Sequence, residues 1–215
     1  MEYKTDKGWE RMGVEKESFG IRGGPDVTVD LKFTRHGPVL WEDAKRALAL
    51  RWVGAEPGTA GYLGSLAVDR AQNWYDFEAA MQRWKVPSEN IVYADTEGNI
   101  GEHSTGLAPL RKNWTGLLPV PGDGKYEWAG FVPTAELPHS FNPTAGFVAT
   151  ANHKMIPENY AYKVGYEWAP QFRVRRIKEV LEGARSSGTK LDVEDMGRLQ
   201  NDVVSLPAKE FIGLL

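Results

Sequence analysis

The chain has 215 residues and contains no cysteine. This absence excludes disulfide bonds, zinc sites built on thiolates and thiol nucleophiles. It does not fix the compartment, because a cysteine-free chain suits the cytosol and the periplasm equally.

A long apolar run and an excess of basic residues are missing too. No apolar run is long enough to span a bilayer, so we expect no membrane contact. The opening segment Met1–Gly8 is polar, so we expect no signal peptide on this chain. With 26 Lys+Arg against 29 Asp+Glu the net charge is −3, which argues against nucleic acid as a partner. The 41% of hydrophobic residues is typical of a globular protein.

Signals for cofactors and nucleophiles are also scarce. The four histidines, His36, His103, His139 and His153, show no metal-ligand spacing, and an ordinary loop or surface role is the simpler interpretation of each. There is no glycine-rich phosphate loop and no HExxH motif. We therefore expect no metal and no cofactor. The one Gly-Ser pair, Gly64-Ser65, lies in an expected helix over Gly61–Val68 without an elbow pattern, which favours a small-residue packing site over a nucleophile.

The chain is rich in turn formers and large rings, with 23 Gly, 13 Pro and 8 Trp. Strands, hairpins and ordered loops are expected beside a few helices. Val27–Phe33 alternates apolar and polar residues like a strand with one buried face. A turn at Gly23–Asp26 precedes it, and Met12–Ile21 is the expected partner strand. The apolar run Ala47–Val53 is too short to be assigned as a strand or as a buried helix.

A helical period begins at Asn73, where Trp74, Phe77, Met81 and Trp84 recur on one face. Asn73 and Asp76 resemble a capping box, and Pro87 is the expected stop. The tryptophans on this stripe are expected in the core.

The remaining chain predicts a hairpin, loops and two helices. We expect a hairpin in which strand Ile91–Ala94 and a return strand from Ile100 flank a turn. Ordered loops are expected over 106–143, followed by a short strand at Phe147–Ala149. A helix after Pro170 is expected to bury Ile177, Val180, Leu181 and Ala184. A further helix, Asp192 to about Val204, should bury Val193, Met196, Leu199 and Val203.

These patterns predict an α+β fold of antiparallel strands plus helices. We expect a single partial domain over 1–215. It divides into a β-rich region over residues 1–55, a mixed helix and hairpin region over 56–105, Pro/Gly/Trp-rich ordered loops over 106–146, and a strand with helices over 147–215.

Two polar residues allow a functional interpretation. Asn152 directly follows the expected strand, so its amide could project from a rigid element as an oxyanion donor; a turn-forming Asn is the competing interpretation. Arg173 falls on the apolar stripe of its helix. It either faces inward and needs partners or snorkels from the first turn. The residues alone leave both questions open.

An ordered set of short segments resembles the penicillin acylase (penicillin amidase) family of N-terminal-nucleophile hydrolases, within an internal segment of its β-chain. The segments are Thr34–Val39, Ala49–Trp52, Asn73-Trp74, Phe77, Tyr93–Asp95, Gly98–Gly101, Pro119–Gly122, Trp128–Gly130, Asn142-Pro143, Gly146, Ala149–Asn152, Arg173 and Arg176-Ile177. They run in family order over most of the chain.

The resemblance implies part of an αββα sandwich and an amidohydrolase that is periplasmic or secreted. Such enzymes cleave linear acyl amides, such as side chains of β-lactams or acyl-homoserine lactones, through a serine acyl-enzyme. The serine's own α-amino group serves as base, since the pKa of such a group is ordinarily about 7.7–8.0. Asn152 matches the family's oxyanion-binding Asn. Arg173 matches the Arg near the nucleophile's amine, where like charge favours the neutral amine.

The resemblance also implies what these residues lack. The family's Gly-Ser cleavage site, its nucleophile, its α-chain and the rest of its β-chain have no counterpart here, so the isolated chain is expected to be inactive and those segments are its expected partners. No calcium ligand is carried over. Two alternatives stay open: a stand-alone binding module with an aromatic platform, and a degenerate non-enzymatic paralogue. Without those segments, an apolar face and unpaired strand edges should be exposed, above all at Val27–Phe33. They predict a homodimer, a higher assembly or a domain-swapped one; the alternative is a monomer in which the loops of 106–143 fold over the gap.

Overall fold

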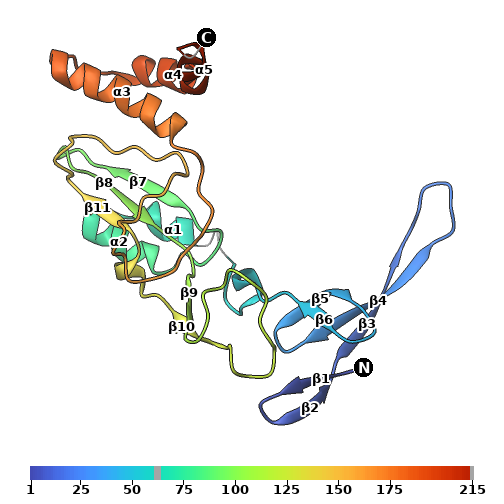
Figure 1. Ribbon diagram of the computed structural model, residues 1–215. Coiled ribbons are helices and arrows are strands. Elements are labelled where there is room, and N and C mark those ends of the chain that lie inside the picture. The colour runs from blue at the N-terminus through green and yellow to red at the C-terminus, as the bar shows by residue number, and fades with distance from the viewer. Residues whose placement is uncertain (61–63, 214–215) are drawn as a thin grey trace. The chain divides into compact units, whose positions relative to one another are not determined.

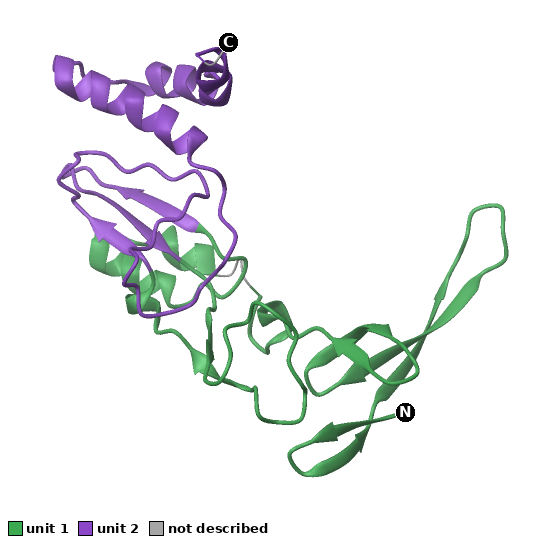
Figure 2. Cartoon of the chain, in the orientation of Figure 1, with its two compact units in different colours: residues 1–89, 105–137 green, residues 90–104, 138–215 purple. Residues whose placement is uncertain are grey.

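A computed structural model describes residues 1–60 and 64–213 of the chain (Figure 1). They form two compact units (Figure 2). Unit 1 comprises Met1–Glu89 and Thr105–Leu137, and unit 2 comprises Asn90–Ser104 and Pro138–Leu215. The single partial domain stays a prediction, since such units also occur within one domain.

Unit 1 begins with two antiparallel sheets. Strands β1 (Glu2–Thr5) and β2 (Gly8–Arg11) form a hairpin. A four-stranded sheet in the order β3-β4-β5-β6 follows, from β3 (Gly13–Phe19), β4 (Val27–Thr34), β5 (Gly37–Glu42) and β6 (Ala47–Ala49). The predicted hairpin is confirmed, because β3 pairs with β4 in register from Gly13↔Phe33 to Phe19↔Val27.

The predicted burial of β4 is wrong for the described chain. Val27 and Leu31 are exposed, as are Leu40 and Trp41 on β5. The alternation of apolar residues is present, but no layer within the described residues of unit 1 covers that face.

The core of unit 1 lies on helix α2 (Trp74–Met81), which buries Trp74, Phe77, Ala80 and Met81, with Trp84 just beyond. Asn73 caps it as predicted, its side chain accepting from the Asp76 amide. The predicted stop at Pro87 is wrong, since the helix ends at Met81. Trp84 then donates its indole N–H to the Pro87 carbonyl at 2.7 Å, so this segment packs without being helical.

The rest of unit 1 is short elements and loops. They are η1 (Val53–Ala55), α1 (Ser65–Val68), η3 (Thr134–Glu136) and the paired strands β9 (Pro109–Arg111) and β10 (Trp128–Phe131). Of the helix expected over Gly61–Val68, positions 61–63 lie outside the described residues. The segment 106–143, expected as loops, contains three short strands, β9, β10 and β11.

Unit 2 contains the sheet β11-β8-β7, with β7 (Asn90–Ala94), β8 (Ile100–Ser104) and β11 (His139–Phe141) all antiparallel. Helices α3 (Phe172–Ser187), α4 (Val193–Gln200) and α5 (Leu206–Ile212) follow. The β7–β8 hairpin and the existence of α3 and α4 are confirmed.

Three details of unit 2 correct the sequence analysis. Residues 147–149 form no strand. On α3 the fully buried residue is Val174, while the four predicted residues are only partly covered. Helix α4 ends at Gln200, and Val193 and Val203 are 87% and 93% exposed. Among the described residues no helix is long and apolar enough to cross a membrane.

Candidate active site

Asn152 lies in a bend rather than at the end of a strand. Its backbone is left-handed, with φ of 60°, a conformation that few residues other than Gly, Asn and Asp adopt readily. The bend is held on both sides, because the Ala169 N–H donates to the Asn152 carbonyl at 2.8 Å and the preceding Ala151 is buried. One residue earlier, Thr150 Oγ1 accepts from Asn90 Nδ2 at 3.1 Å, which ties the segment to β7. One hydrogen bond to a loop and one to β7 therefore supply the rigidity that the sequence analysis ascribed to a strand before Asn152.

Arg173 lies in the first turn of α3 and contacts this bend. Its Nη2 donates to the Ala151 carbonyl at 2.8 Å and to Asn152 Oδ1 at 3.0 Å. The guanidinium therefore finds its partners at the start of its helix, close to the chain segment that it stabilises. Asn152 and Arg173, which the resemblance assigns to one catalytic centre, are thus in direct contact although 21 positions of sequence separate them.

This contact determines which way the Asn152 amide faces. A guanidinium has only donors, so the atom of Asn152 that meets it is the carbonyl oxygen. The Nδ2 group, with its two N–H donors, then remains for a ligand. A donor whose orientation is set before a ligand arrives is the kind that stabilises a developing oxyanion most effectively.

Two residues of unit 2, His153 beside the bend and Glu102 on β8, each have a buried polar atom and are each affected by the charge of Lys178. His153 Nδ1 is buried without a hydrogen-bond partner. Burial lowers the pKa of His153, and the charge of Lys178 on α3 lowers it further. Glu102 on β8 also has a buried, unpartnered oxygen, Oε2. Burial raises the pKa of Glu102, against the opposing effects of the Ser140 hydroxyl and the charge of Lys178. Sequence reasoning missed Glu102 and Lys178, because only the fold brings Lys178 close enough to act on both groups.

The other histidines have structural surroundings. His36 Nε2 lies 2.8 Å from Glu127 Oε1. His103 is buried and stacks on the cross-strand neighbour His139, with ring centroids 5.3 Å apart. No group of three or more His, Asp or Glu side chains is arranged to hold a metal within the described ranges 1–60 and 64–213.

Gly64 makes a close backbone approach in unit 1. A Cβ at this position would lie 3.0 Å from the Trp84 Cα. The absence of a side chain at Gly64 therefore allows this close packing. This contact agrees with the interpretation of Gly64-Ser65 as a packing site.

Several of the segments that carry the family resemblance meet at Glu127 in unit 1. Its carboxylate accepts from Arg35 at 2.9 Å, lies against His36 and accepts from Arg51 at 3.1 Å. Arg51 also lies over the Trp128 ring at 4.4 Å. Burial alone would raise the pKa of Glu127, but His36 and the two arginines outweigh it and hold that pKa below its ordinary value. These segments therefore maintain the fold of unit 1.

Comparison with known proteins decides the family. The model of the penicillin amidase family matches residues 1–215. The chain belongs to the penicillin amidase family. Its relatives include penicillin acylase 2 proenzyme of Pseudomonas sp. (strain SE83), 28% identical over 92% of this chain and 25% of that protein. The acyl-homoserine lactone acylase QuiP of Pseudomonas fluorescens (strain Pf-5) is 31% identical over 95% of this chain and 25% of that protein.

A solved structure agrees with this assignment. A thermostable penicillin G acylase from Alcaligenes faecalis has a TM-score of 0.77 and 26% identity, over 92% of this chain and 35% of that chain. The fold is thus the mixed α+β fold of a penicillin amidase. The chain spans about a quarter of the length of the curated relatives it matches.

Proposed function

We propose that this chain is the segment of an acyl-amide hydrolase that supplies one oxyanion donor, the Nδ2 group of Asn152. One observation carries the proposal: Arg173 Nη2 donates to Asn152 Oδ1 at 3.0 Å and leaves the amide N–H groups for a ligand. The family relationship supports the reaction type, because its named members are penicillin and acyl-homoserine lactone acylases.

In the proposed reaction a serine hydroxyl attacks the amide carbonyl of a linear acyl amide, and the carbonyl oxygen becomes an oxyanion. Asn152 donates a hydrogen bond to that oxyanion, which lowers the barrier when the donor is already oriented. Arg173 is a positioning residue, since it acts through Asn152. Its charge also favours the neutral, basic form of an α-amino group brought near it.

We further propose that the nucleophile is not among these 215 residues, so that the chain on its own is inactive. The packing of Gly64 against Trp84 supports this, because it accounts for the one Gly-Ser pair without catalysis. The test is incubation of the purified chain with a phenylacetyl amide and with an acyl-homoserine lactone. No turnover is expected. Hydrolysis that Asn152→Ala abolishes would contradict the proposal and direct attention to Ser65.

The positioning role has its own test by NMR of the Asn152 side-chain amide. In the wild type, the Nδ2 protons are expected at chemical shifts displaced from those of a mobile, exposed Asn, because one rotamer is held. Arg173→Met should return them to the mobile values, whereas Arg175→Met, which removes a neighbouring exposed arginine that pairs with Glu210 instead, should not. Unchanged Asn152 signals in Arg173→Met would exclude Arg173 as the group that orients the amide.

A further inference from the structure

Strands β4 and β5 pair over only a short stretch of their length. The ladder covers Phe33↔Pro38 and Thr34↔Gly37, next to the turn. Beyond it β4 continues back to Val27 and β5 continues on to Glu42. The far side of β4 is paired with β3 along nearly its whole length, and the far side of β5 is paired with β6. Residues 30–32 of β4 and 39–42 of β5, which line one groove, thus lie outside the ladder.

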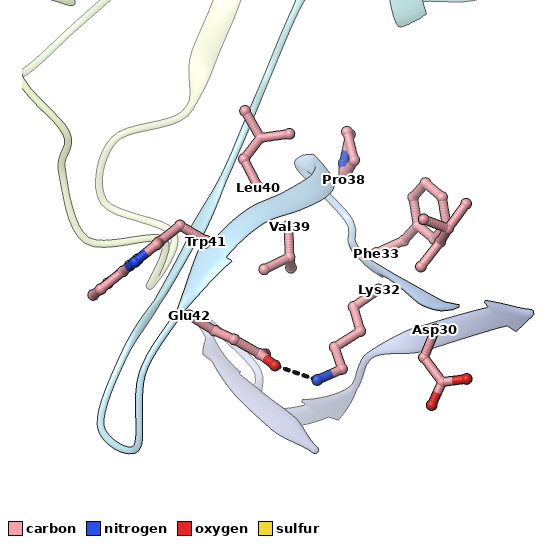
Figure 3. A pocket seen from close by; sticks show the side chains of 9 residues that line it. Asp30, Lys32, Phe33, Pro38, Val39, Leu40, Trp41 and Glu42 are labelled. Atoms are coloured by element: carbon pink, nitrogen blue, oxygen red, sulfur yellow. Dashed lines mark hydrogen bonds and ion pairs between the residues drawn. The ribbon is translucent and has the colours of Figure 1, made fainter. Parts of the chain in front are cut away.

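An open groove of about 360 Å³ lies between these edges (Figure 3). Its lining combines apolar side chains from both strands, among them Leu31, Phe33, Val39 and Trp41. Lys32 and Glu42 reach toward each other from the two strands and form an ion pair (Figure 3). Where backbone pairing stops, a side-chain contact joins the strands instead.

Unpaired strand edges have a specific chemical complement. Each presents alternating N–H and C=O groups that pair best with another extended backbone. An occupant strand between β4 and β5 satisfies both edges at once, and the apolar lining receives alternate side chains of that strand. The charged side chains that line the groove limit the net charge of the strand that can bind there. Lys32 and Glu42 neutralise each other and Asp30 leaves one negative charge at the rim, so a neutral or weakly basic strand fits.

We propose that this groove is a strand-acceptor site, filled by an extended segment from the portion of the acylase polypeptide that this chain does not span. The occupant is assigned to the same polypeptide because this chain covers only about a quarter of the length of its curated relatives and 35% of the solved acylase chain. The proposal rests on family membership and the groove, and it is independent of the roles proposed for Asn152 and Arg173.

The test uses the full 215-residue chain and synthetic peptides, each about as long as β4 with a short flank at either end, that tile the sequence of Alcaligenes faecalis penicillin G acylase outside the matched region. Hydrogen exchange of backbone amides is the readout. At least one peptide of neutral or weakly basic composition is expected to slow exchange at 30–32 and 39–42 by about tenfold or more. The amides of β3 that already pair with β4 should change little.

Two leucine variants form a matched pair. Leu31→Arg places a charge in the groove, and Leu48→Arg places the same charge on β6, outside the groove lining. The two leucines are 38% and 43% exposed, so both variants are expected to fold. The first should lose the peptide-induced protection and the second should keep it.

Glu42→Gln separates an acceptor groove from a merely structural contact. An entering strand must displace the Lys32–Glu42 pair, so weakening the pair should tighten peptide binding by roughly threefold, as expected for a partly exposed ion pair. Weaker binding in Glu42→Gln would overturn the proposal. So would protection by no peptide, or equal protection in Leu31→Arg. Protection that arises from raising the protein concentration alone would show a second copy as the occupant and would overturn it as well.

Discussion

Asn142 and Asn152 are the two described residues other than glycine with left-handed backbones, at φ of 46° and 60°. Both lie in unit 2 and both are exposed. Asn142 uses both ends of its side chain for structure: its Oδ1 accepts from the Ile100 N–H at 2.9 Å, and its Nδ2 donates to Asn99 Oδ1 at 2.8 Å. Asn152 uses Oδ1 alone, through Arg173.

The same residue type in the same conformation thus has two different sets of hydrogen-bond partners. An Asn with both ends engaged closes a corner of the sheet: the Asn142 N–H donates to the Ile100 carbonyl at 2.8 Å, and Asn142 Oδ1 accepts the Ile100 N–H in return. An Asn with its acceptor engaged by a pure donor keeps an oriented amide for something else. Partners, and not conformation, separate Asn142 from Asn152, the residue for which we propose a function.

The largest effect on stability is expected at Asn142. Asn142→Ala loses two hydrogen bonds and places Ala in a left-handed backbone, which together should cost about 2–3 kcal/mol. Urea unfolding measures it. Asn142→Gly removes the backbone strain, so it should recover about half of the loss. Equal losses for Ala and Gly would assign the whole cost to the side-chain contacts.

A smaller loss is expected at Arg173. Arg173→Met removes two charge-assisted hydrogen bonds, but these lie near the surface and are screened by solvent, so about 0.5–1 kcal/mol is expected. The same urea titration compares it with Asn142→Ala. A loss as large as that of Asn142→Ala would show the Asn152 bend to be as structural as the Asn142 corner.

The smallest effect is a pH dependence at the Asn152 bend. Because the folded-state pKa of His153 lies below its ordinary value, its contribution to stability is fully present above the unfolded pKa of about 6.5. It is lost as pH falls from that value through the lower folded-state pKa. His153→Gln should remove this loss. The free energy of unfolding of the variant, relative to that of the wild type, should therefore rise as pH falls from about 7.5 to about 5. The raised pKa of Glu102 acts in the opposite direction but is common to both proteins. A constant difference between the two proteins would contradict the assigned shift.

Local features of the fold could be predicted from the sequence where periodicity and capping determine them. The β3–β4 hairpin, the cap at Asn73 and the buried stripe of α2 follow from neighbouring residues. Periodicity could not reveal whether a covering layer exists within the chain. Leu31 and Val193 belong to regular apolar patterns and are nevertheless exposed.

The sequence allowed the two residues of the candidate site to be predicted, but not the structure that holds them. The resemblance assigns Asn152 and Arg173 to one catalytic centre, and the structure shows them in contact. The strand expected before Asn152 is absent, because Ala169 and Thr150 hold the bend through hydrogen bonds that no periodic pattern encodes. Glu102 and Lys178 come from separate elements and carry no shared local signal.

The central claim, that Asn152 supplies an oriented donor to an oxyanion, is tested most directly by a chimera. These 215 residues replace the matched segment of the Alcaligenes faecalis penicillin G acylase, and kcat for a phenylacetyl amide is measured per processed enzyme. Asn152→Ala is predicted to lower kcat by about 10²–10³-fold, the cost of one oxyanion donor. Asn142→Ala, the matched control, should lower the yield of folded enzyme but leave its kcat unchanged. A processed Asn152→Ala chimera with undiminished kcat would contradict the account.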